Sequence, residues 1–127
     1  MAKTAAAPTH AERSAMLTQA VTETANHLNV GPTDLAAIVG ISQSSASRMF
    51  NGGFFIKEGT PEWQLAALFV RLYRGLFSIV GNSDALAREW LTSGNHAFDG
   101  RSPLEVIKSI IGLVSACDYI DAHRAQV

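Results

Sequence analysis

Residues 60–80 constrain the fold of this chain most, because almost every side of this segment is apolar. Apolar side chains recur along two neighbouring stripes with the alternating three- and four-residue spacing of an α-helix. The first stripe contains Trp63, Ala66, Val70, Tyr73, Phe77 and Val80. The second contains Leu65, Phe69 or Leu68, Leu72, Leu76 and Ile79. A helix that is apolar nearly all round must be covered on most sides. The sequence therefore predicts an all-α protein built around one long central helix.

Two arrangements can cover such a helix in a chain of 127 residues. In the favoured one, the first stripe faces the core of its own chain and the second meets another copy in a homodimer. The residues predicted for this dimer interface are Leu65, Phe69, Leu72 and Leu76. The alternative is a central helix that its own chain encloses completely.

Residues 33–52 contain two short helical patterns separated by the turn Gly40-Ile41-Ser42. Thr33 is expected to cap the first helix and Ser42 the second, and Gly40 supplies the positive φ angle of the turn. This spacing resembles the helix-turn-helix of phage-repressor and Xre-type regulators. In such a motif the second helix enters the major groove. The residues on its outer side, which the resemblance makes candidates for DNA binding, are Gln43, Ser44, Ser45, Ser47 and Arg48.

Further helix-start and helix-stop signals divide the rest of the chain. Thr9 and Glu12 have the spacing of a capping box, so a first helix is expected over residues 9–28. A connector at 52–59, either a short strand or an apolar loop, precedes the long helix. Another helix, capped by Asn82-Ser83-Asp84, is expected to run to about Thr92, and a break at 93–95 follows it. Two regions result, namely residues 1–59 with the helix-turn-helix and residues 60–127 with the long helix and a helical C-terminal domain.

The last predicted helix has an unusually complete start signal in Ser102, Pro103 and Glu105. An apolar run follows it, and the pattern continues to Arg124, with Gly112 marking a kink or a join between two helices. Such an apolar segment must be covered. We expect the long helix of the same chain to supply part of the cover and another protein to supply the remainder.

Composition excludes several classes of function. The net charge of −1 provides no general attraction to nucleic acid, so DNA binding would depend on a local surface or on pairing of two copies. A single cysteine provides no disulfide framework and suits a reducing cytoplasm. No segment has the length of a membrane span or of a signal sequence, so no membrane partner is expected. The four histidines are scattered, and no nucleophile or phosphate-loop motif is present. We therefore expect no enzyme activity, no metal and no cofactor.

An ordered set of short motifs in the second half resembles the toxin-binding domain of the Xre/MbcA/ParS family of bacterial antitoxins. The motifs are Leu72-Tyr73-Arg74, Trp90-Leu91, Asn95, Gly100-Arg101-Ser102-Pro103-Leu104, Gly112-Leu113 and Tyr119-Ile120-Asp121. No single motif is specific, but their order and spacing are. The resemblance covers approximately residues 60–124.

The resemblance implies a partner, a RES-domain toxin that consumes NAD⁺ or uses it to ADP-ribosylate a target. It also implies that the antitoxin dimerises, blocks the active site of the toxin with its C-terminal region and represses its own operon through operator DNA. The candidate toxin-binding residues are Asn95, Arg101, Tyr119, Asp121, His123 and Arg124. The alternative function is a dimeric Xre-like transcriptional regulator without a toxin partner. The apolar, slightly acidic terminal region favours the antitoxin.

Overall fold

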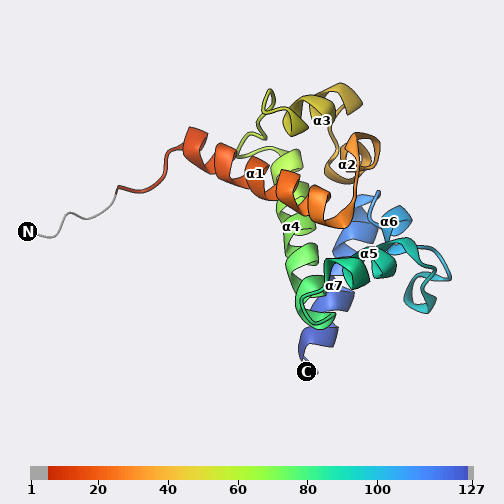
Figure 1. Cartoon of the computed structure of the whole chain (residues 1–127). Helices are drawn as coiled ribbons and strands as arrows, with labels where there is room; N and C mark the ends of the chain where they lie inside the picture. The colour runs from red at the N-terminus through yellow and green to blue at the C-terminus, as the bar shows by residue number, and fades with distance from the viewer. Residues whose placement is uncertain (1–5, 126–127) are drawn as a thin grey trace, which may run out of the picture.

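The computed structural model describes residues 6–125, and this part of the chain is helical without any strand (Figure 1). The elements are α1 (His10–Leu28), α2 (Pro32–Val39), α3 (Gln43–Phe50), α4 (Pro61–Ile79), α5 (Asp84–Thr92), the 3₁₀-helix η1 (His96–Phe98), α6 (Pro103–Val106) and α7 (Ile110–Ala125). The predicted all-α fold is confirmed. No single helix within residues 6–125 is long and apolar enough to cross a membrane; α4 passes that test only together with residues 84–98, across a bend of 115°.

Side-chain caps fix most helix starts where the sequence predicts them. Thr9, Ser42 and Thr60 each accept a hydrogen bond from the backbone N–H three residues ahead. Thr33 is an exception, and its predicted capping role is wrong. Helix α2 begins at Pro32 with Gly31 as its N-cap, and no side chain caps it. Proline at the first helical position needs no N–H partner and has the φ angle of a helix, so the helix can start before Thr33.

Helix α4 runs through the middle of the molecule and packs against α1, α2 and most extensively α7 (Figure 1). Both of its apolar stripes are therefore used within one chain. Phe69, Leu72 and Leu76 are at most 1% exposed. The prediction that they meet a second copy is wrong, because α1, α2 and α7 already cover them. The enclosed central helix is the arrangement that the structure adopts. Leu65, the fourth predicted interface residue, is half-buried and packs against the same core.

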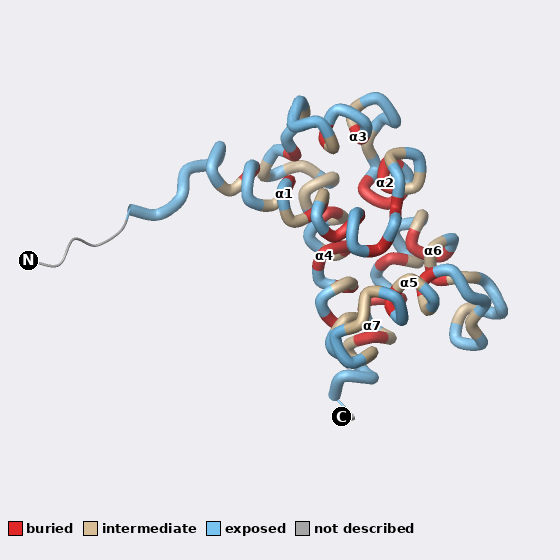
Figure 2. Tube along the Cα trace, viewed as in Figure 1, coloured by how far each residue is buried: buried red, intermediate tan, exposed pale blue. Residues whose placement is uncertain are grey.

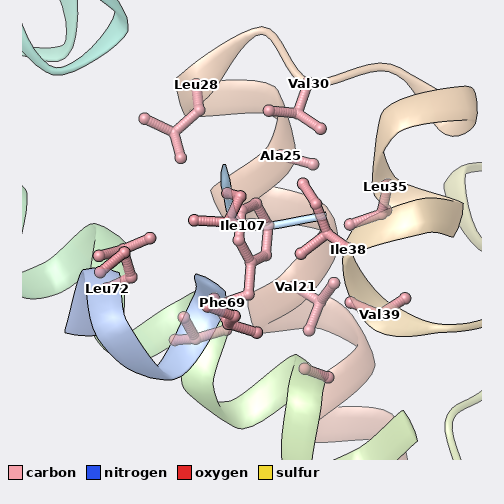
Figure 3. Packing of buried hydrophobic residues seen from close by; sticks show 14 of the residues in the cluster. Val21, Ala25, Leu28, Val30, Leu35, Ile38, Val39, Phe69, Leu72 and Ile107 are labelled. Atoms are coloured by element: carbon pink, nitrogen blue, oxygen red, sulfur yellow. The ribbon is translucent and has the colours of Figure 1, made fainter. Parts of the chain in front are cut away.

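One hydrophobic core extends through the whole described chain. Ile107, from the link after α6, is fully buried beside Val21 of α1, Ile38 of α2 and Phe69 of α4 (Figure 3). Buried segments likewise line the facing sides of α1, α2, α4 and α7 in Figure 2. The boundary predicted between residues 59 and 60 is therefore a change in sequence pattern, and the core continues across it.

The last helical segment is broken earlier than the sequence indicates. Helix α6 ends at Val106, residues 107–109 form a turn, and α7 starts at Ile110. Gly112 lies in the first turn of α7, where a Cβ atom would be 1.9 Å from the carbonyl oxygen of Val106. Gly112 thus permits α7 to pass close to the end of α6. The break between the two helices lies at residues 107–109, just before Gly112.

Candidate functional site

The start of α7 carries an exposed apolar surface, here called the α7 patch, formed by Ile110, Ile111 and Val114. These side chains are 64%, 81% and 42% exposed. The opposite face of the same helix, which includes Leu113 and Ile120, is buried against the core. Helix α7 therefore has two apolar faces, of which one packs against its own chain and the other faces solvent. The predicted need for a second cover applies to this outer face.

An aromatic cluster joins α5, η1 and α7. The ring of Tyr119 stacks on Trp90 with 6.4 Å between centroids, and it packs on Phe98 at 5.5 Å. Tyr119 is consequently half-buried. The ring of His123 lies one turn later, with its centroid 4.2 Å from that of Tyr119, and His123 is exposed. Of these two predicted toxin contacts, Tyr119 belongs to the cluster and His123 extends beyond it.

A shallow hollow of about 600 Å³ separates the loop before α6 from α7. Its lining includes Phe98, Arg101, Val106, Ser115, Asp118 and Tyr119. Arg101 is exposed at its rim, as predicted for a contact residue. Asn95 is half-buried, and its side-chain Oδ1 accepts a hydrogen bond from the backbone N–H of Ala97 at 2.9 Å. Asn95 therefore caps η1 and shapes the loop that carries Arg101.

The end of α7 crosses α4 closely. A Cβ atom on Gly75 would lie 2.6 Å from Cγ2 of Ile120 and 3.3 Å from Cδ of Arg124. Asp121 forms an ion pair with Arg71 of α4. Arg124 is exposed, with its side-chain stem along α4. Arg101, His123 and Arg124 are thus the exposed members of the predicted set, while Asn95, Tyr119 and Asp121 are half-buried.

The predicted DNA-reading residues lie on α3. Gln43, Ser44, Ser47 and Arg48 are exposed, and Ser45 is half-buried. The side-chain N–H of Gln43 donates to Oγ1 of Thr33 in α2 at 2.8 Å, and Arg48 donates to Oγ of Ser45 at 3.2 Å. Thr33, which was expected to be a cap, therefore holds the amide of Gln43 from the neighbouring helix.

Sequence reasoning missed a polar network that joins α1, α4 and α5. The hydroxyl of Tyr73 donates to Oδ1 of Asp84 at 2.7 Å, and Nδ1 of His27 lies 2.7 Å from Oδ2. Arg88 donates to the carbonyl oxygen of His27 at 2.7 Å. The bonds from Tyr73 and then from His27 lower the pKa of Asp84. These residues are too far apart in sequence for a spacing rule to connect them. The network fixes the start of α5 against the first helix.

The described residues contain no group of three or more side chains suited to bind a metal ion. No curated protein matches the chain. Residues 75–125 match the family model described as the antitoxin Xre/MbcA/ParS C-terminal toxin-binding domain. The matched segment contains α5, η1, α6 and α7, and with them the α7 patch and the hollow beside it. The resemblance carried by the sequence motifs is confirmed, and residues 75–125 belong to the C-terminal toxin-binding domain family of Xre/MbcA/ParS antitoxins.

Proposed function

We propose that this protein is a cytoplasmic antitoxin that binds a RES-domain toxin and blocks the site at which the toxin uses NAD⁺. The family match supports a toxin as the partner. The α7 patch is the observation that carries the proposal, because it is a large apolar surface inside the matched segment. The protein acts by binding, and catalysis belongs to its partner.

The α7 patch suits a tight complex for two reasons. Complete burial of a large apolar side chain contributes about 1.5–3 kcal/mol, and each residue of the patch gains the share that corresponds to its remaining exposed area. The patch is also preorganised, because the opposite face of α7 is fixed to the core. A surface that is already in its bound shape loses little conformational entropy on binding.

Polar groups at the two ends of this surface supply specificity. Arg101 stands at the rim of the hollow, and His123 and Arg124 project from the last turn of α7. Arginine forms paired hydrogen bonds with carboxylates and phosphates. We propose that the end of α7 enters the cleft of the toxin, where Arg124 pairs with a carboxylate and keeps the nucleotide out.

A second role, repression of its own operon, is proposed for the exposed face of α3. Gln43 can pair with an adenine edge, and Arg48 with a guanine or a phosphate. Arg48 is the only basic residue on α3. The phosphate contacts of one copy are therefore few, and useful operator affinity requires a homodimer. A dimeric regulator without a toxin is the second candidate, and the exposed face of α3 is the observation that favours it.

Co-expression tests the proposal. The chain is produced together with a RES-domain toxin encoded beside its gene, and growth, co-purification and cellular NAD⁺ are measured. The unaltered chain should restore growth and retain the toxin. Ile111→Asp should weaken the complex at least about tenfold, since it places a charge in an apolar interface. Met16→Asp is the matched control, because Met16 is 63% exposed outside the matched segment.

Absence of both growth rescue and co-purification with the unaltered chain would exclude the antitoxin function. Operator binding that persists under those conditions would support the regulator instead. Equal toxin binding by Ile111→Asp and the unaltered chain would show that the α7 patch is not the contact surface.

A further inference from the structure

The proposed homodimer needs a surface other than α4, whose apolar stripes pack against the core of a single chain. Outside the family-matched segment, the large apolar side chains exposed in the described residues are Met16 and Phe55. Phe55 is 52% exposed in the loop between α3 and α4. We propose that a second copy of this chain docks on the surface around Phe55, with the Phe55 ring of each copy entering a hollow beside that of the other. This inference rests on the proposed dimeric function and adds the surface that forms the dimer.

The exposed side chain of Phe55 lies between two hollows, and both hollows are lined by residues of α1. One hollow, of about 560 Å³, is lined by Phe55, Lys57 and the first turns of α1, including Ala11 and Ala15. The other, of about 340 Å³, is lined by Phe55, Phe54 and Phe50 and by α1 as far as Glu23. A two-fold interface requires a surface that is complementary to itself. A projecting ring with a hollow on either side satisfies that requirement.

The loop that carries Phe55 is held firmly against α1. Ile56 is buried, its N–H donates to Oγ1 of Thr18 at 2.9 Å, and its carbonyl oxygen accepts from the hydroxyl of Ser14. Glu58, two residues later, forms an ion pair with Arg13. These bonds use buried polar side chains of α1 to fix a loop whose largest side chain is left in solvent. The Phe55 surface is therefore formed before any partner arrives, which lowers the entropy lost on docking.

The charges around Phe55 favour a second copy as the occupant. Lys57 lines the hollow on the N-terminal side of α1, and Glu23 lines the hollow on the other side. A two-fold axis that passes beside Phe55, perpendicular to the line joining the two hollows, would exchange these ends and bring Lys57 of each copy to face Glu23 of the other. Arg13 and Glu58 already neutralise each other. The same surface is thus complementary to itself in charge as well as in shape.

Docking at this surface has a consequence for α3. Met49 and Phe50, from the last turn of α3, line the hollow on the Glu23 side. The two copies of α3 would consequently be fixed relative to each other by the contact itself. A fixed separation between two recognition helices is what a palindromic operator requires.

Reversing the charge of Lys57 or of Glu23 tests the inference. The oligomeric state of the full chain is measured by sedimentation equilibrium at low salt. Lys57→Glu and Glu23→Lys should each weaken the homodimer about tenfold, because like charges then face each other across the axis. An equimolar mixture of the two variants should form a heterodimer, since all facing charges are again opposite. Both residues are exposed, and circular dichroism should report unchanged helices.

A second experiment removes the aromatic ring of Phe55. Phe55→Gln should make the chain monomeric at concentrations where Leu86→Gln, an equally exposed apolar position in α5, remains dimeric. A monomeric unaltered chain, or a mixture of charge variants that fails to pair, would overturn the inference. Loss of toxin co-purification by Phe55→Gln, with the dimer intact, would assign the surface to the toxin and equally overturn it. Toxin binding by the monomeric variants keeps this test separate from that of the antitoxin function.

Discussion

Lys108, in the link between α6 and α7, forms an ion pair with Asp34 of α2, with 3.0 Å between Nζ and Oδ1. Lys108 also contacts Glu105 at 2.8 Å, and both carboxylates raise the pKa of its amino group. We expect Lys108→Met to lower the free energy of unfolding by about 1 kcal/mol or less, the range of partly exposed ion pairs. A double-mutant cycle with Asp34→Ala in urea measures the coupling. Additive effects of the two substitutions would show that the pair contributes nothing.

Gly112 should tolerate no side chain. In Gly112→Ala the new Cβ would overlap the carbonyl oxygen of Val106, which lies 1.9 Å from its position. The backbone must then shift, and we expect a loss of about 2 kcal/mol or more in unfolding free energy. Gly53→Ala is the control, because its nearest atom is an ordinary contact at 3.6 Å. Thermal unfolding compares the two variants, and equal melting temperatures would contradict the prediction.

Cys117 should make the protein less stable in alkali. Burial raises the pKa of its thiol from 9.0 to about 11. A raised folded-state pKa gives stability that is complete below the unfolded value and is lost as pH rises from about 9 to about 11. The loss should reach about 2 kcal/mol. Urea unfolding across this range should show a smaller loss for Cys117→Ala than for the unaltered chain. A thiol reagent should also leave the folded protein unlabelled near neutral pH.

Most helix positions follow from the sequence because they depend on local chemistry. Thr9, Ser42, Thr60 and Ser102 cap helices through bonds to residues three positions away, which a spacing rule detects. The partner of each apolar face depends instead on tertiary packing. The periodicity of α4 indicates two apolar stripes, but it cannot distinguish a second copy from α7 of the same chain.

In the candidate site, too, the sequence predicts the features that depend on local chemistry but not those that depend on tertiary packing. The exposed ends, Arg101 and Arg124, follow from loop and terminus signals, and the structure leaves both exposed. The intrachain partner of Asp121 is Arg71, fifty positions away, and no local pattern indicates that ion pair. Ile110 and Ile111 were expected to need a cover, and only the fold shows that they face outward.

Arg124 provides a test of how the toxin is blocked. Arg124→Ala should weaken toxin binding about tenfold, the effect of losing one charged contact in an interface. Arg48→Ala is the control, because Arg48 is also exposed but lies on α3, outside the matched segment. Affinity is measured by calorimetry with purified toxin. Unchanged affinity and unchanged neutralisation would exclude a role for Arg124 in the cleft.

Thr33 should affect operator binding without touching DNA. Its hydroxyl holds the amide of Gln43, so Thr33→Val removes that acceptor and frees the Gln43 side chain. We expect operator affinity to fall about threefold to tenfold, less than for Gln43→Ala, which removes the proposed base contact itself. Fluorescence anisotropy with operator DNA measures both. A Thr33→Val protein that binds like the unaltered chain would show that Gln43 needs no support.

Ile107 belongs to the matched toxin-binding segment, yet it completes the core formed by α1, α2 and α4. Because the two ends share this core, we expect them to unfold together. Removal of the C-terminal helices would also remove Ile107, a side chain on which α1 and α2 pack. The proposed toxin-binding and DNA-binding surfaces should therefore be lost together when the protein unfolds.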